Sequence, residues 1–285
     1  MKTIRIEAPE QVNTRHGGGS TATKILLLVG LLLMSVSAAH AAVQGKEVIY
    51  TVGDTTLKGY IAYDDALKDA RPGILVVHEW WGHNEYARKR ARMFAERGYT
   101  ALALDMYGDG KQAHHPDEAG KFATEVSQNT ALTQARFEGA LALLKREKSV
   151  DPDNIAAVGY CFGGTVVLNM ARIGEPLKAV ASFHGGLSTP HPAEPGRVKA
   201  RIISFTGEAD PMIPATQVAA FRKEMEQASV NYKVVTYPGA KHAFTNPEAD
   251  KFGAKFKLPL AYNAAADKAS WKETLAFLAE AFKKN

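Results

Sequence analysis

Short apolar runs recur along the chain after residue 70, separated by longer segments that mix apolar and polar side chains. Within the runs, apolar and polar positions do not alternate, which is typical of strands in a parallel sheet covered on both faces. We predict strands at Ile74–Val77, Thr100–Leu104, Ile155–Val158, Ala179–Phe183, Ile202–Phe205 and Tyr232–Thr236. Ahead of them, Glu47–Val52 and Thr56–Tyr63 flank a Gly53-Asp54 turn, which predicts an antiparallel hairpin.

The segments between the predicted strands carry helical patterns, because apolar side chains recur every three or four residues. These segments are Ala87–Ala95, Phe137–Leu144, Thr216–Ala228 and Ala264–Lys283, and the second is expected to end near a turn at Asp151-Pro152. The alternation of strands and helices indicates one three-layer α/β domain with a mostly parallel sheet. Ligands of such sheets bind beyond the carboxyl ends of the strands, so functional side chains are expected there.

The first 41 residues have a different character. An uncharged apolar run, Ile25–Val36, follows Lys24, and Ala39 and Ala41 stand at the spacing that signal peptidase recognises. We predict a signal peptide over residues 1–41, cleavage after Ala41, a mature domain over 42–285 and a periplasmic or secreted location. The alternative is an uncleaved N-terminal anchor, although the run is short for a bilayer.

Charge and cysteine content narrow the possible functions. Four basic and two acidic residues precede Ala42, so the net charge of +5 for the chain leaves about +3 for the mature part. This mild surplus contains no basic tract, and nucleic acid is not an expected partner. Cys161 is the only cysteine, so no internal disulfide can form. In an oxidising compartment such a cysteine is either buried and inert or a reactive thiol.

Cys161 stands in the segment Gly159-Tyr160-Cys161-Phe162-Gly163-Gly164, between the strand Ile155–Val158 and a helix expected to begin near Thr165. This is the nucleophile-elbow pattern G-x-S-x-G with cysteine in place of serine. The strained turn requires small neighbours, and a helix N-terminus favours a thiolate. We predict that Cys161 is a nucleophile; the alternative is a structural cysteine buried in a tight turn.

A thiolate nucleophile needs a base and a group that orients the base. Asp210 follows the strand Ile202–Phe205 and His242 follows Tyr232–Thr236, in the order nucleophile, acid, histidine. Each residue alone is weak evidence, since an aspartate before proline is often only a turn former. Together on one rim of the sheet, they predict a Cys-His-Asp triad.

The segment after the strand Ile74–Val77 reads His78-Glu79-Trp80-Trp81-Gly82. Hydrolases of this topology place the second oxyanion donor here, so the backbone N–H groups of Phe162 and Trp80 are predicted to form an oxyanion hole. Glu79 is predicted to have a functional role beside the nucleophile, the alternative being a salt-bridged surface acid.

Taken together, GYCFGG, the Asp-Pro loop, the G-x-x-H-x-F segment and the glutamate of HEWWG resemble the dienelactone hydrolases (carboxymethylenebutenolidases) of the α/β-hydrolase superfamily. The resemblance covers nearly the whole mature chain and implies a three-layer α/β-hydrolase fold that opens an ester or lactone. It also implies that Cys161, Asp210 and His242 form the triad. Glu79 matches the family's glutamate, which interacts with the resting cysteine and helps to generate the thiolate when substrate binds.

The chain departs from that family at two positions. Dienelactone hydrolases hold the carboxylate of their substrate with two arginines, and Asp109 and Asn246 stand at the corresponding positions here. The resemblance therefore implies the reaction class and not the substrate. We expect a preference for neutral activated esters. The alternative is a binding protein of the hydrolase fold or a thiol sensor without useful turnover.

Several further residues have two possible roles. The predicted pocket residues are Trp81, Tyr107, His184 and Asn246, although aromatic core packing and a hydrogen-bonded strand end are open alternatives for the first three. The loop Asp250–Tyr262 is expected to cover the site or to pack ordinarily. Loop histidines, such as His114 and His115, lack the spacing of a metal site. We expect no metal, no cofactor, a monomer, a small-molecule substrate and no stable membrane association after cleavage.

Overall fold

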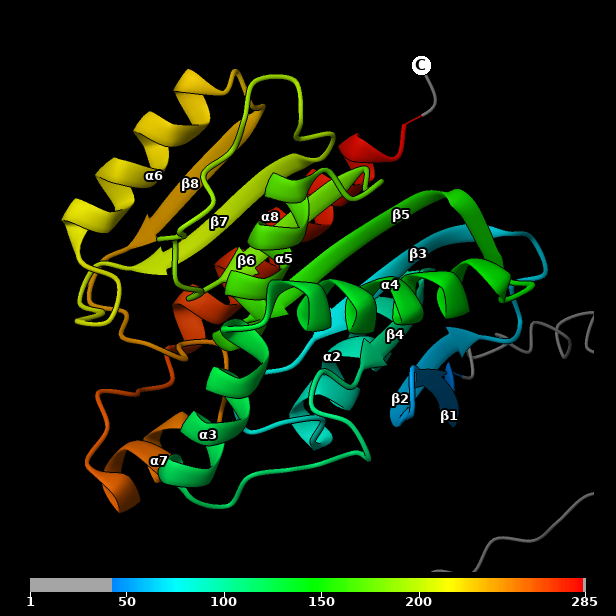
Figure 1. Cartoon of the computed structure of the whole chain (residues 1–285), viewed down its shortest axis with the longest axis horizontal. Coiled ribbons are helices and arrows are strands. Elements are labelled where there is room, and N and C mark those ends of the chain that lie inside the picture. Colours follow the sequence, from blue (N-terminus) through cyan, green and yellow to red (C-terminus); the bar gives the residue numbers. More distant parts are fainter. Residues whose placement is uncertain (1–42, 284–285) are drawn as a thin grey trace, which may run out of the picture. The chain divides into compact units, whose positions relative to one another are not determined.

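The computed structural model describes residues 43–283, and the predicted signal peptide lies outside this range. These residues contain one eight-stranded sheet, with the strand order β1-β2-β4-β3-β5-β6-β7-β8 (Figure 1). The pairs β1–β2 and β2–β4 are antiparallel, and every other pair is parallel. The strands are β1 Val43–Val52, β2 Thr55–Asp64, β3 Arg71–Val77, β4 Thr100–Leu104, β5 Val150–Tyr160, β6 Ala179–Phe183, β7 Arg201–Gly207 and β8 Tyr232–Tyr237.

Helices cover both faces of this sheet. They are α2 Glu85–Ala95, α3 Pro116–Ser127, α4 Thr130–Arg146, α5 Phe162–Ile173, α6 Ala215–Gln227, α7 Ala249–Phe256 and α8 Ala264–Ala281. Leu75 and Val77 of β3 join a core with α4, α5 and α6, whereas Ile74 and Val76 join a second core with α2 and α8. Figure 1 shows α4 and α5 in front of the strands and the red helix α8 behind them. The predicted three-layer α/β fold is confirmed.

The central strands are buried on both faces, as their uninterrupted apolar runs predict. Every residue of β4 and of β6 is buried. Within residues 43–283, no helix combines the length and the apolar character needed to cross a bilayer.

The turn predicted at Asp151-Pro152 is wrong, because both residues lie inside β5. The register of β5 against β3 shifts there, so that Pro72 pairs with Asp151 and Gly73 pairs with Ile155. Proline cannot donate a backbone hydrogen bond, and an irregularity in the pairing is where a strand tolerates it. The strand therefore begins earlier than its apolar run.

Two helices were not predicted, namely α3 and α7. Pro116 occupies the first turn of α3, and the His115 ring nitrogen Nδ1 accepts a hydrogen bond from the Asp117 amide at 3.3 Å. The exposed His115 is thus an N-cap residue. Helix α7 forms the first part of Asp250–Tyr262, which was predicted as a loop, and it ends at Lys257 with φ 53°.

Candidate active site

The turn between β5 and α5 is sharply strained at Cys161, which has φ 53° and ψ −116°. A Cβ atom on Gly159 would lie 2.0 Å from the Gly163 carbonyl oxygen, and one on Gly163 would lie 2.4 Å from the Val77 carbonyl oxygen. Neither position can hold a side chain without moving backbone, so the glycines permit the turn. Helix α5 begins at Phe162, three residues before the predicted start, and the half-buried thiol stands at its N-terminus.

Three side chains from separate loops meet at this turn. His242 follows β8, and its Nε2 lies 3.0 Å from Cys161 Sγ. Its Nδ1 lies 2.8 Å from Oδ2 of Asp210, which follows β7. Both His242 and Asp210 are buried. The structure therefore brings the three residues into one line at the carboxyl edge of the sheet.

The protonation of His242 depends on its neighbours. Burial lowers its pKa, but the charge of Cys161 and the hydrogen bonds with Asp210 and Cys161 outweigh burial and raise the pKa to about 10. These interactions favour the protonated form of the ring while it faces the sulfur. An imidazolium in this position stabilises a thiolate.

The loop after β3 is fixed to the cysteine turn through His78. The His78 carbonyl oxygen accepts a hydrogen bond from the Gly163 amide at 3.1 Å. The His78 ring nitrogen Nδ1 donates to the Glu79 carbonyl oxygen at 2.6 Å, and the ring nitrogen Nε2 accepts from the Met106 amide at 3.2 Å. Within residues 43–283, the amides of Phe162 and Trp80 have no acceptor. The two N–H groups are therefore free to bind a developing oxyanion.

A cavity of about 330 Å³ opens beside the thiol. Apart from Cys161 and His242, every side chain on its wall is apolar, and none carries a charge. The lining residues are Trp80, Ala123, Cys161, Phe162, Met212, His242, Leu258, Pro259 and Leu260. This wall suits an uncharged, apolar group next to the sulfur.

This architecture is shared with known proteins. The model of the family described as "Dienelactone hydrolase family" matches residues 57–282. The chain belongs to this family. As a dienelactone hydrolase family member with an α/β-hydrolase fold, it is a carboxylic ester or lactone hydrolase.

Individual relatives cover most of the chain. Protein usf from Aquifex pyrophilus is 28% identical over 241 residues, which span 83% of this chain and 98% of that protein. A protein of Aquifex aeolicus with the provisional name carboxymethylenebutenolidase is 28% identical over 211 residues, or 72% of this chain and 89% of that one. The crystal structure of a dienelactone hydrolase-like promiscuous phosphotriesterase from metagenomic libraries is 32% identical. Its TM-score is 0.77, and the match covers 85% of this chain and 100% of that chain.

Glu79 and Asn246 form a buried pair behind the thiol of this dienelactone hydrolase family member. Asn246 Nδ2 donates to Glu79 Oε2 at 2.6 Å, and Glu79 Oε1 has no hydrogen-bond partner among the described residues. Burial raises the pKa of Glu79 to about 7, although the Asn246 hydrogen bond and the charges of His242 and Arg90 act in the opposite direction. The carboxylate thus contacts Asn246, and the thiol contacts His242.

Replacing Glu79 by glutamine is expected to change how stability depends on pH. The folded protein holds the Glu79 proton more tightly than the unfolded chain, so the parent loses stability as pH rises from about 4.5 to about 7. Glu79→Gln removes that loss. The free energy of unfolding of the variant should therefore rise by about 3 kcal/mol relative to that of the parent as the pH is raised from 5 to 8. Urea unfolding of both proteins at pH 5 and at pH 8 measures this change. An equal difference in unfolding free energy between variant and parent at the two pH values would contradict it.

The four residues predicted to line the pocket are absent from the cavity wall. Trp81 is buried and stacks on Phe252 of α7, with ring centroids 4.6 Å apart. Tyr107 is also buried, and its hydroxyl donates to the Trp80 carbonyl oxygen at 3.0 Å. His184 lies beneath the cysteine turn, and Asn246 is held by Glu79. Packing and hydrogen bonding hold all four side chains away from the cavity. Asp109, where the family carries an arginine, is exposed.

The actual wall includes residues that the sequence did not single out. Ala123 lies on α3, which was not predicted, and Met212 follows Asp210. Leu258, Pro259 and Leu260 follow α7, and the Ala261 amide donates to the His242 carbonyl oxygen at 3.2 Å. The expected covering segment therefore contributes its last residues to the cavity and is bonded to the histidine loop.

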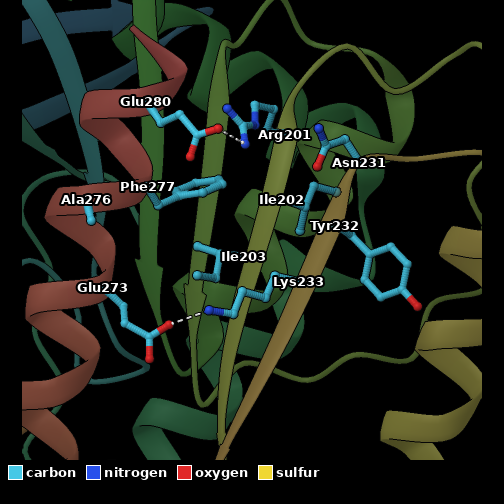
Figure 2. A pocket seen from close by; sticks show the side chains of 10 residues that line it. All are labelled: Arg201, Ile202, Ile203, Asn231, Tyr232, Lys233, Glu273, Ala276, Phe277 and Glu280. Carbon is cyan, nitrogen blue, oxygen red and sulfur yellow. Dashed lines mark hydrogen bonds and ion pairs between the residues drawn. The ribbon is translucent and has the colours of Figure 1, made fainter. Parts of the chain in front are cut away.

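Other potential sites lack comparable chemistry. In the described part of the chain, no three or more His, Cys, Asp or Glu side chains are grouped to hold a metal ion. A cavity of about 290 Å³ lies between α8 and the first residues of β7 and β8 (Figure 2). Arg201 pairs with Glu280 and Lys233 pairs with Glu273 across it, both at 2.9 Å. These strand ends are opposite to the edge that carries Cys161.

Proposed function

We propose that this hydrolase uses Cys161 as its nucleophile, with His242 and Asp210 as the other members of a triad. The contact of 3.0 Å between Cys161 Sγ and His242 Nε2, at the strained turn, carries the proposal. The thiolate attacks the ester or lactone carbonyl carbon. The oxyanion then accepts hydrogen bonds from the amides of Phe162 and Trp80.

Two proton transfers by His242 complete the reaction. When the tetrahedral intermediate collapses, the carbon–oxygen bond to the alcohol breaks, and the departing oxygen takes the His242 proton. The acyl group remains on Cys161 as a thioester. His242, now neutral, removes a proton from water, which attacks the thioester and releases the acid and the thiolate. Asp210 keeps Nδ1 protonated and stabilises the imidazolium.

The cavity wall supports a neutral, apolar acyl group as the substrate portion beside the sulfur. Apart from His242, no side chain of the wall can carry a positive charge, and the positions where the family carries carboxylate-binding arginines are Asp109 and Asn246. Asp109 is exposed on its loop, and Asn246 is committed to Glu79. Because the His242 imidazolium already faces the thiolate, a carboxylate in this cavity would lose water without gaining a cationic partner of its own, which is unfavourable.

A panel of p-nitrophenyl esters tests this preference. We expect kcat/KM for p-nitrophenyl butyrate to exceed kcat/KM for a p-nitrophenyl ester whose acyl chain is of similar length and ends in a carboxylate. The expected ratio is at least about 10-fold, because the carboxylate must be desolvated. A neutral aryl phosphotriester belongs in the panel, since a relative is described as a promiscuous phosphotriesterase. The Cys161→Ala protein supplies the background rate. Faster turnover of the anionic ester would contradict the assignment.

Trapping the covalent intermediate tests the mechanism itself. A stoichiometric burst of p-nitrophenol from the butyrate, with the acyl group recovered on the Cys161 peptide, is the expected result. Iodoacetamide labelling separates this proposal from the alternative of a thiol sensor. An enzyme loses esterase activity in step with labelling of Cys161, whereas a sensor is labelled with no activity to lose.

Export is a further part of the proposal, supported by the sequence of the first 41 residues alone. The basic flank, the apolar run and the alanines before Ala42 favour cleavage by signal peptidase. Fractionation of a Gram-negative host that produces the full chain tests it. A periplasmic product that begins at Ala42 is expected, and an uncleaved cytoplasmic product would contradict export.

A further inference from the structure

The backbone of the cysteine turn is held from below by a histidine. The Cys161 amide donates both to the Phe183 carbonyl oxygen at 2.9 Å and to Nδ1 of His184 at 3.1 Å. His184 is fully buried and has φ 40°. A residue with a strained backbone and a buried side chain that is bonded to the cysteine turn is held there by several contacts at once.

The acceptor role of Nδ1 fixes the protonation of this ring. Nδ1 must present a lone pair to the Cys161 amide, so Nε2 carries the hydrogen. Nε2 then donates to the Thr245 hydroxyl oxygen at 2.8 Å. Burial lowers the pKa of His184, and the charges of His242 and Arg90 lower it further, so that the ring stays neutral.

Thr245 connects this ring to the loop that carries His242. It lies three residues after His242, and the rings of His184 and His242 are 5.3 Å apart. The hydroxyl of Thr245 is also 2.6 Å from the Tyr86 hydroxyl. His184 and Thr245 therefore connect the cysteine turn to the histidine loop within the protein interior.

The outer end of this connection is fixed by an ion pair between the buried Arg90 and the half-buried Asp267. Arg90 of α2 donates to the Thr245 carbonyl oxygen at 2.6 Å and to Asp267 Oδ1 of α8 at 2.7 Å. Its Nε donates to the Tyr86 hydroxyl at 3.2 Å. The two helices on one face of the sheet thus hold the Thr245 backbone in place.

We propose that His184 and Thr245 are positioning residues that hold the Cys161 sulfur and the His242 imidazole at their working separation. The inference rests on the proposed triad. Proton transfer between the two groups depends on their distance, and a small displacement of either loop is costly for the rate. Neither residue touches the cavity, so the effect is expected in kcat and in thiol reactivity rather than in KM.

Replacing Thr245 tests this proposal. Thr245→Val keeps the shape and removes the hydroxyl, and Thr245→Ser keeps the hydroxyl. Tyr86→Phe removes the hydroxyl that contacts both Thr245 and Arg90. Thr274→Val is the matched control, because Thr274 is equally buried and its hydroxyl donates to Ser270 within α8. For each protein, kcat and KM for p-nitrophenyl butyrate, the alkylation rate of Cys161 by iodoacetamide at pH 6 and the melting temperature are measured.

We expect Thr245→Val to lower kcat about 10- to 100-fold with KM changed less than about twofold, and to slow alkylation in parallel. Thr245→Ser should recover most of both rates, and Tyr86→Phe should fall between parent and Thr245→Val. Thr274→Val should match the parent in both rates, whatever its melting temperature. Equal rates for the two valine variants, or no recovery in Thr245→Ser, would overturn the proposal. The alkylation rate of Cys161 does not depend on turnover. It therefore tests the positioning separately from the triad, which an active Cys161→Ala protein would refute.

Discussion

Replacing Cys161 by alanine is expected to lower kcat for p-nitrophenyl butyrate by about 10⁴-fold or more. The proposed mechanism depends on a covalent bond to the sulfur, and among the described residues no other thiol, hydroxyl or carboxylate side chain lines the cavity. Steady-state assays with the mature protein, at enzyme concentrations high enough to detect a residual rate, measure the loss. The proposed oxyanion donors, the amides of Phe162 and Trp80, and the cavity remain, so a small rate above that of water is expected to persist.

This substitution is well suited to the question because it leaves the turn intact. Alanine and cysteine both have an unbranched Cβ, so both meet the same backbone strain at φ 53°. Cys161→Ser replaces only the half-buried sulfur atom by an oxygen atom, so it serves as a second variant of nearly equal shape. Near-parental turnover by folded Cys161→Ala protein would remove Cys161 from the reaction and with it the thioester mechanism.

Replacing His242 by alanine is expected to lower kcat by about 10³- to 10⁴-fold and to slow alkylation of Cys161 at pH 6. In the proposed mechanism, His242 supplies both the positive charge that stabilises the thiolate and the proton for the departing alcohol. Because the two groups act as a unit, the double variant Cys161→Ala/His242→Ala should be no slower than Cys161→Ala alone. Kinetic assays of the single and double variants measure this non-additivity.

His191→Ala is the matched control for this second prediction, because His191 is exposed and is not one of the residues of the cavity wall. It should retain parental rates of turnover and alkylation. A His242→Ala protein within about tenfold of the parent would show that another base serves Cys161. If the loss of kcat in the double variant equals the product of the losses in the two single variants, the two residues act independently.

The sheet was predictable because its signal is local. Strands such as Thr100–Leu104 and Ala179–Phe183 are buried on both faces, so their apolar runs give their bounds directly. The eight-residue helix α7 was missed since a helix of this length is stabilised by tertiary packing rather than by its own sequence. Pro116, followed by two acidic residues, was a readable start signal for α3.

The candidate triad was predictable for a geometrical reason, whereas the pocket was not. Parallel strands deliver their carboxyl ends to one edge, so the loops after β5, β7 and β8 had to lie together. The wall combines residues of α3 with the segment after α7, and their meeting depends on packing between distant parts of the chain. The Glu79–Asn246 hydrogen bond joins residues 167 positions apart and has no local signal.

The two sides of the cavity differ in how freely protein engineering can alter them. Leu260 forms a bridge with His242, and the neighbouring Ala261 amide is bonded to the His242 backbone. Bulky replacements at Leu258 or Leu260 are therefore expected to displace His242, the proposed general base, along with the wall. Ala123 stands on α3 without such a bond. A mutant library that seeks new acyl-chain selectivity at an undiminished rate should diversify Ala123 first and leave Leu260 for a later round.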